Sequence, residues 1–135
     1  MREAGARTVA VALPNDDKQT LAFVAEAAGM ATYRFEKYFG RDKAASTREI
    51  DELIIAGGLS DDAAAKAIET GQTVAAAVGL ARDLVNEPGS VIHPTAITKV
   101  ARKIAEEQGF EIEVLGPEEM DAQGMGAIRA VGKGS

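Results

Sequence analysis

The sequence predicts an α/β fold in which a long helix divides the chain into two halves. Strand-like and helix-like segments alternate along the 135 residues, which is the pattern of α/β proteins. A helical pattern of apolar residues runs through residues 61–86 and stops before a proline at position 88. We therefore expect three parts, namely residues 1–60, the helix at 61–86, and residues 87–135.

The first part begins with a strand and a helix. Residues 8–13 (TVAVAL) form a short apolar run rich in small and β-branched residues, which predicts a buried strand. Asp16 and Asp17 then stand where helix N-caps stand. The helix after them is predicted from apolar residues at three- and four-residue spacing, although Gly29 weakens this pattern. The predicted inner face consists of Leu21, Val24, Ala28, Ala31 and Phe35.

A loop and a second strand lead to the long helix. Residues 36–49 are polar and lack a clear period, which predicts a surface loop. Residues 49–56 (EIDELIIA) predict a strand that stops at the glycine pair 57–58. Residues 60–62 (SDD) suit the cap and first turn of the helix that follows. The predicted inner face of that helix consists of Ala64, Ala67, Gly71, Val74, Val78, Ala81 and Val85.

The third part predicts two helices and two strands. Thr95 is expected to cap a helix that ends at Gly109. Residues 110–115 (FEIEVL) alternate apolar and polar, as a half-exposed strand does. A short helix is predicted for residues 117–124, between a proline and a glycine, and a last strand for residues 127–131. The inner face of the first helix is predicted to carry Ile97, Val100, Ala101 and Ile104.

Composition excludes several classes of protein. Hydrophobic residues make up 46% of the chain and charged residues 27%, which is normal for a soluble globular protein. The net charge of −6 and the lack of a basic face argue against nucleic-acid binding. There are no cysteines, so disulfides, thiolate metal sites and cysteine nucleophiles are excluded. No apolar run reaches the roughly 20 residues of a membrane helix.

The residues do not assemble an active site by pattern alone. His93 is the single histidine, and a general base would need an orienting partner and a cleft, so we interpret it as a loop histidine next to a proline. The glycine-rich residues 132–135 lack the glycine spacing and the following helix of a P-loop. Four acidic pairs are explained by helix caps and solvated helix faces. They are Asp16-Asp17, Asp61-Asp62, Glu106-Glu107 and Glu118-Glu119.

Several stretches resemble the leucyl (cytosol) aminopeptidase family. Residues 80–88 (LARDLVNEP) resemble the ARDLVN-x-P passage that ends the long interdomain helix of that family. Residues 124–127 (GMGA) and 130–135 (AVGKGS) resemble its GMG and AVGQGS passages, with lysine where glutamine is common. Residues 33–38 (YRFEKY) look like its Y-x-F-x-x-Y stretch.

The resemblance implies portions of two α/β domains joined by a long helix. Residues 1–60 would be part of the amino-terminal domain, 61–86 the linker helix and 87–135 the beginning of the catalytic domain. The parent enzyme would be a cytoplasmic homo-oligomer, a hexamer, that hydrolyses N-terminal residues from peptide substrates. It would use two divalent metals, zinc or manganese, to activate a bridging water and polarise the scissile carbonyl.

No catalytic, cofactor-binding or metal residue is assigned to this chain. Lys133 superficially resembles the metal-binding lysine of the family's GKG-x-x-F-D passage, but its context places it after the earlier AVGQGS strand. The catalytic and metal residues are therefore expected beyond Ser135, and the chain by itself is expected to be inactive. Two alternatives stay open: a short stand-alone α/β assembly or interaction module without catalysis, and an unrelated α/β enzyme that uses His93.

Overall fold

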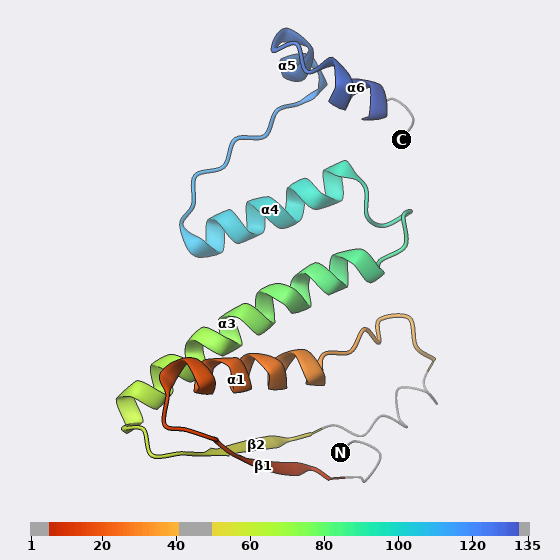
Figure 1. The fold of residues 1–135 in the computed structure, drawn as a ribbon. Coiled ribbons are helices and arrows are strands. Elements are labelled where there is room, and N and C mark those ends of the chain that lie inside the picture. The colour runs from red at the N-terminus through yellow and green to blue at the C-terminus, as the bar shows by residue number, and fades with distance from the viewer. Residues whose placement is uncertain (1–5, 41–49, 133–135) are drawn as a thin grey trace. The chain divides into compact units, whose positions relative to one another are not determined.

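The computed structural model describes residues 6–40 and 50–132, and the chain divides into two compact units, Met1–Asn86 and Glu87–Ser135. Most of the described residues are helical, with a small parallel sheet in the first unit, which is compatible with the predicted α/β class. In chain order (Figure 1) the elements are β1 (Thr8–Ala12), α1 (Lys18–Thr32), β2 (Glu52–Ala56), α3 (Asp61–Asn86), α4 (Pro94–Gln108), α5 (Pro117–Ala122) and α6 (Gly126–Gly132).

The two strands of the first unit form a parallel sheet. Val9 lies opposite Leu53, and Val11 lies opposite Ile55. Parallel strands need a crossover connection, and α1 supplies it between β1 and β2. Both predicted strands are confirmed, although β2 begins only at Glu52 and not at residue 49, which lies outside the described residues.

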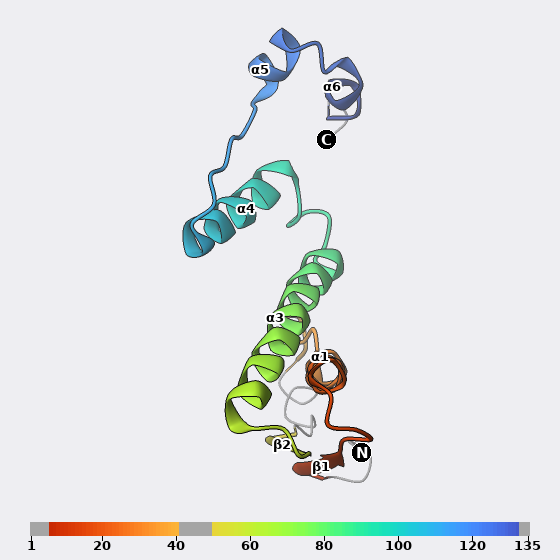
Figure 2. The same cartoon turned by 60° about the vertical axis from the view of Figure 1, so that its left-hand side comes forward.

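One face of this sheet is covered by helix. Val9 is buried, and Leu53, which lies opposite it in the sheet, is half-buried. Helix α1 lies over the two strands (Figures 1 and 2). The alternate residues point the other way, and Ile54 among them is 46% exposed. The prediction that residues 8–13 form a buried strand is therefore wrong for every second residue. A parallel strand is buried on both faces only where further elements cover both sides of its sheet.

Helix α1 begins where the N-cap was predicted. The carboxylate of Asp17 accepts a hydrogen bond from the amide of Thr20 at 2.8 Å, which satisfies a free donor of the first turn. Leu21 is buried as predicted, and Ala25 is buried as well. The helix ends at Thr32, so the prediction that Phe35 belongs to its inner face is wrong.

Helices α1 and α3 approach each other at glycines. A Cβ built on Gly29 would lie 2.5 Å from the Cβ of Ala75, so the two helices are close enough there to exclude a side chain. Gly71 is buried against α1 in the same way. The sequence suggested that Gly29 weakens the helix pattern. The structure shows instead that α1 is continuous through Gly29 and that this glycine is a point of contact between helices.

Helix α3 has the predicted bounds, Asp61–Asn86, but only part of the predicted inner face. Ala67 and Gly71 are buried, whereas Val74 is 40% exposed and Val85 is 85% exposed. Beyond Gly71 the contacts continue every four residues, at Ala75 against α1 and at Gly79 against Tyr33, the residue after α1. Val74 and Val85 of the predicted inner face lie off this line of contact.

The second unit begins with α4, which is the clearest amphipathic helix. His93 is its N-cap and Pro94 its first residue, so the prediction of Thr95 as the cap is wrong. Proline fits the first helical position because that residue has no intrahelical partner for its amide. Gly109 ends the helix with φ 70°, as predicted, and its amide donates to the carbonyl of Ala105.

The two strands predicted in the second unit are both wrong. Residues 110–116 have no regular structure, and residues 126–132 form the helix α6 in place of a strand. A strand needs a neighbouring strand for its backbone hydrogen bonds, whereas a helix satisfies them within one segment. The described part of this unit offers no such neighbour.

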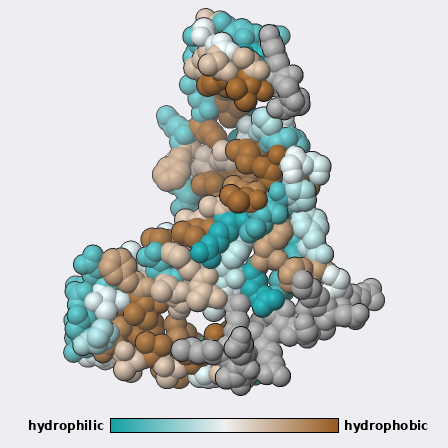
Figure 3. Space-filling view, turned by 45° about the vertical axis from the view of Figure 1, so that its right-hand side comes forward, coloured by the Kyte–Doolittle hydropathy of each residue, from teal (hydrophilic) through white to brown (hydrophobic). Residues whose placement is uncertain are grey.

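The second unit buries little apolar surface. Ala105 is its one buried residue among those the structure describes. Phe110 is 66% exposed, Ile128 61% and Val131 80%. Hydrophobic residues, drawn in brown, are visible on the face shown in Figure 3. In the described ranges, no helix is both long and apolar enough to cross a membrane.

Candidate functional site

His93 has a structural place at the start of α4. Its backbone carbonyl accepts hydrogen bonds from the amides of Ala96 at 2.8 Å and Ile97 at 3.1 Å, as the carbonyl of an N-cap does. Its side chain makes no cap hydrogen bond and is exposed. The loop interpretation of this histidine agrees with that position.

The first acidic pair connects turns of the first unit. Asp16 accepts a hydrogen bond from the amide of Gly58 at 2.5 Å, so it ties the turn after β1 to the turn after β2. Asp17 caps α1 through the amide and hydroxyl of Thr20, and these hydrogen bonds lower the pKa of its carboxyl group. Both carboxylates therefore accept hydrogen bonds from backbone amides of the first unit.

The remaining acidic pairs lie on separate helices. Asp61-Asp62 occupy the first turn of α3 and Glu118-Glu119 the first turn of α5, where the helix dipole favours negative charge. Glu107 at the end of α4 lies 3.6 Å from the ammonium group of Lys103. Within residues 6–40 and 50–132, no three metal-ligating side chains come together, so this donor set does not fit a two-metal centre. Lys133 lies outside the described residues.

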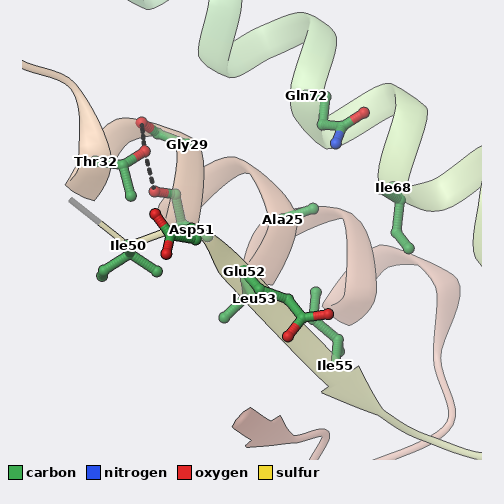
Figure 4. Close-up of a pocket in the computed structure, with 11 residues that line it drawn as sticks. Ala25, Gly29, Thr32, Ile50, Asp51, Glu52, Leu53, Ile55, Ile68 and Gln72 are labelled. Atoms are coloured by element: carbon green, nitrogen blue, oxygen red, sulfur yellow. Dashed lines mark hydrogen bonds between the residues drawn. The ribbon is translucent and has the colours of Figure 1, made fainter. Parts of the chain in front are cut away.

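Two pockets flank the contact between α1 and α3. The first has a volume of about 370 Å³ and lies between these helices and β2 (Figure 4). In this pocket the hydroxyl of Thr32 donates back to the carbonyls of its own helix, and Asp51 pairs with Arg7 at 2.5 Å. The walls are otherwise largely small or aliphatic, from Ala25, Ala28, Leu53, Ile55 and Ile68.

The second pocket has a volume of about 490 Å³. It is an open groove between α1 and α3, with Phe23 58% exposed and Val74 40% exposed among its lining residues. Lys18 and Lys66 lie among its polar lining residues, together with Glu26.

A polar cluster joins the ends of α1 and α3. The hydroxyl of Tyr33, the residue after α1, donates to the carboxylate of Asp83 at 2.8 Å and accepts from the side-chain amide of Asn86 at 3.3 Å. The guanidinium of Arg82 lies 5.4 Å from the centre of the Tyr33 ring and donates to the carbonyl of Met30 at 3.1 Å. We call Tyr33, Arg82, Asp83 and Asn86 the Tyr33 cluster.

The environment of the cluster perturbs the phenol. Partial desolvation raises the pKa of Tyr33, and its hydrogen bond to the Asp83 carboxylate raises that pKa further. The amide of Asn86 and the charge of Arg82 act in the opposite direction without reversing the shift. The neutral phenol is therefore the form that this site stabilises.

Sequence reasoning missed this cluster. Its members lie in two stretches, 33–38 and 80–88, about fifty residues apart, and spacing within either stretch does not reveal that they meet. A usable signal was the polar series Arg82, Asp83 and Asn86, at helical spacing near the end of an otherwise alanine-rich helix.

Comparison with known proteins gives a consistent result. Residues 79–135 match the profile of the cytosol aminopeptidase family, catalytic domain. The chain is 36% identical to a probable cytosol aminopeptidase of Aquifex aeolicus (strain VF5), over 100% of this chain and 27% of that protein. It is 41% identical to the one from Roseiflexus castenholzii (strain DSM 13941 / HLO8), over 84% of this chain and 24% of that protein.

A third relative shows the same relation in length. The probable cytosol aminopeptidase of Sulfurihydrogenibium sp. (strain YO3AOP1) is 37% identical over 78% of this chain and 21% of its own length. The chain thus spans about a quarter of the length of the curated relatives that it matches. No solved structure matches the chain.

Proposed function

The chain belongs to the cytosol aminopeptidase family, and from that premise we propose that it is a segment of a metal-dependent aminopeptidase that removes N-terminal residues from peptides. The observation that carries this proposal is the similarity over 100% of the chain to a protein of which it covers 27%. The relatives are named for aminopeptidase activity, and the chain shares a quarter of their length with them.

The proposal assigns three parts of the chain to two domains and the helix between them. Residues 1–60 are part of an amino-terminal α/β domain, residues 61–86 form the linker helix, and residues 87–135 begin the catalytic α/β domain. The exposed apolar side chains of the second unit support this, since Phe110, Ile128 and Val131 need a surface to cover them. Residues 110–115, which alternate apolar and polar, would pair as a strand once a neighbouring strand is present.

The metals and the chemistry are proposed to lie in other parts of the longer protein. The acidic pairs of the described residues serve helix ends and turns, so we derive no reaction step from them. Two divalent ions, zinc or manganese, a peptide substrate, a cytoplasmic location and a hexameric assembly are parts of the same proposal, which the family relationship supports.

Peptidase activity of the chain tests the proposal directly. We expect the purified chain, with an intact mass of 14.1 kDa, to show no hydrolysis of a leucine anilide with added manganese or zinc. A full-length cytosol aminopeptidase of the family, assayed in the same buffers, is the positive control. Metal-dependent hydrolysis by the verified 135-residue chain would overturn the claim that the chemistry lies elsewhere.

The open groove favours one alternative, a stand-alone assembly module. Phe23 and Val74 present apolar surface between two helices, and such a patch is typical of a contact site. Sedimentation of the wild-type chain and of a Phe23→Ser variant tests this alternative. A defined oligomer that Phe23→Ser dissociates would favour the module, and a monomer in both cases would leave the aminopeptidase segment as the better interpretation.

A further inference from the structure

The structure brings together two family-like stretches that the sequence keeps apart. Tyr33 opens the stretch 33–38, and Arg82, Asp83 and Asn86 belong to the stretch 80–88. We infer that the Tyr33 cluster holds the last turn of α3 against the end of α1, and that this attachment is the role of Arg82, Asp83 and Asn86 in the family-like stretch.

The phenol hydroxyl of Tyr33 makes two of the hydrogen bonds of the cluster. It donates to Asp83 and accepts from Asn86, two residues three positions apart and thus on one face of α3. One hydroxyl group therefore engages both ends of the last helical turn. The carboxylate makes the first of these a charge-assisted hydrogen bond, which is the stronger kind.

Arg82 connects the Tyr33 cluster to the backbone of α1. The carbonyl of Met30 is one of the last of that helix, where carbonyl groups lack an intrahelical partner. Arg82 supplies a donor to this carbonyl while its guanidinium lies over the Tyr33 ring. Arg82 thus satisfies a carbonyl group at the end of α1, and Tyr33 binds the side chains of Asp83 and Asn86 at the end of α3.

This turn of α3 buries little apolar surface. Val85, its β-branched apolar residue, is 85% exposed, and only Leu84 is half-buried there. Gly79, one turn earlier, meets the ring of Tyr33 in ordinary contact at 3.7 Å. Past Gly79, the polar contacts of Tyr33 and Arg82 therefore carry the attachment of α3 to α1.

The same contacts argue against a chemical role for these motif residues. Arg82 and Asp83 each have a partner within the first unit, and so does Asn86. A side chain that binds substrate or metal would have to give up such a contact first. Their resemblance to a family passage is therefore explained by the attachment of the helix.

Hydrogen exchange of the 135-residue chain tests whether the Tyr33 cluster holds the last turn of α3. Tyr33→Phe keeps the ring and removes the hydroxyl, so both hydrogen bonds of that hydroxyl are lost. We expect the amides of residues 83–86 to exchange about tenfold faster, while the amides of residues 64–72 keep their wild-type rates. Tyr38→Phe removes the other phenol of the chain, from a residue that is 54% exposed, and is the matched control, for which we expect unchanged exchange at 83–86.

Tyrosine titration gives a second and independent readout. In Tyr38→Phe the single remaining phenol is Tyr33, and tyrosinate absorbance should show its pKa above the ordinary value of 10.0. Adding Asp83→Asn should lower that pKa toward the ordinary value, whereas adding Glu69→Gln on the same helix should not change it. Unchanged exchange in Tyr33→Phe together with an ordinary Tyr33 pKa would overturn the inference. Both readouts work without peptidase activity, so their failure is distinct from failure of the proposed function.

Discussion

Replacing Gly71 with alanine tests the close approach of α1 and α3 that forms the first unit. A Cβ at this position would lie 2.8 Å from the amide nitrogen of Glu26 and 2.9 Å from the Cβ of Ala25, and it would overlap the carbonyl oxygen of Ala22. Two of these three atoms belong to the backbone of α1. No change of rotamer can make room, so α1 as a whole must move away from α3.

Two opposing terms set the magnitude. Overpacking a close contact costs roughly 1–3 kcal/mol, and contact with backbone atoms places Gly71 in the upper part of that range. Alanine in place of glycine inside a helix favours the folded state by about 1 kcal/mol. The net loss of unfolding free energy is about 1–2 kcal/mol, which lowers the melting temperature by roughly 4–16 °C for a unit of this size.

Gly79→Ala is the matched control on the same helix. A Cβ there would meet only the Tyr33 ring, at 3.7 Å, which is an ordinary contact. The helix-propensity term then acts alone, and we expect a gain of about 1 kcal/mol and a higher melting temperature. Thermal unfolding followed by far-ultraviolet circular dichroism measures both variants. Shifts of the same sign in the two variants would refute the reasoning.

Three further predictions concern the ends and the core of helices. Gly109→Ala forces a side chain into φ 70° and should cost about 1 kcal/mol, which chemical unfolding would measure; an unchanged midpoint would contradict it. Leu21→Ala removes a side chain that is 3% exposed and should cost about 2–5 kcal/mol in the same assay, whereas the exposed Phe23→Ala should cost much less. The pKa of Asp17 is lowered from 3.8, so its stabilising effect should be complete above that pH and be lost as the pH falls through the folded-state pKa. Acid unfolding of Asp17→Ala should lack this component, and an unchanged pH profile would show that the cap contributes nothing.

The elements of the first unit could be predicted because their signals are local. Asp17 as a cap, the helix from Asp61 to Asn86 and the strand before Gly57 follow from a few neighbouring residues. Gly29 was misjudged for the complementary reason. Its value depends on Ala75, which lies across a helix contact that no local pattern reveals.

The second unit shows where local patterns end. Residues 110–115 and 127–131 have strand-like composition, yet neither forms a strand, since strands form only in pairs. The sequence predicts Thr95 as the cap of α4, whereas Pro94 already occupies the first helical position and His93 precedes it. The first error came from judging two segments without partner strands, and the second from overlooking the adjacent proline, which is a local signal.

The sequence by itself determined the helices of the first unit and the cap of α1, because these follow from residue types at short spacing. Its motifs also resemble the cytosol aminopeptidase family, and the similarity to relatives of that family agrees with this resemblance. The tertiary structure alone decided which glycines are helix contacts and that Tyr33 meets Arg82, Asp83 and Asn86. The physical reason is distance along the chain. Residues about fifty positions apart interact only after two helices have packed, and that packing depends on the whole surface of each helix and not on any one segment.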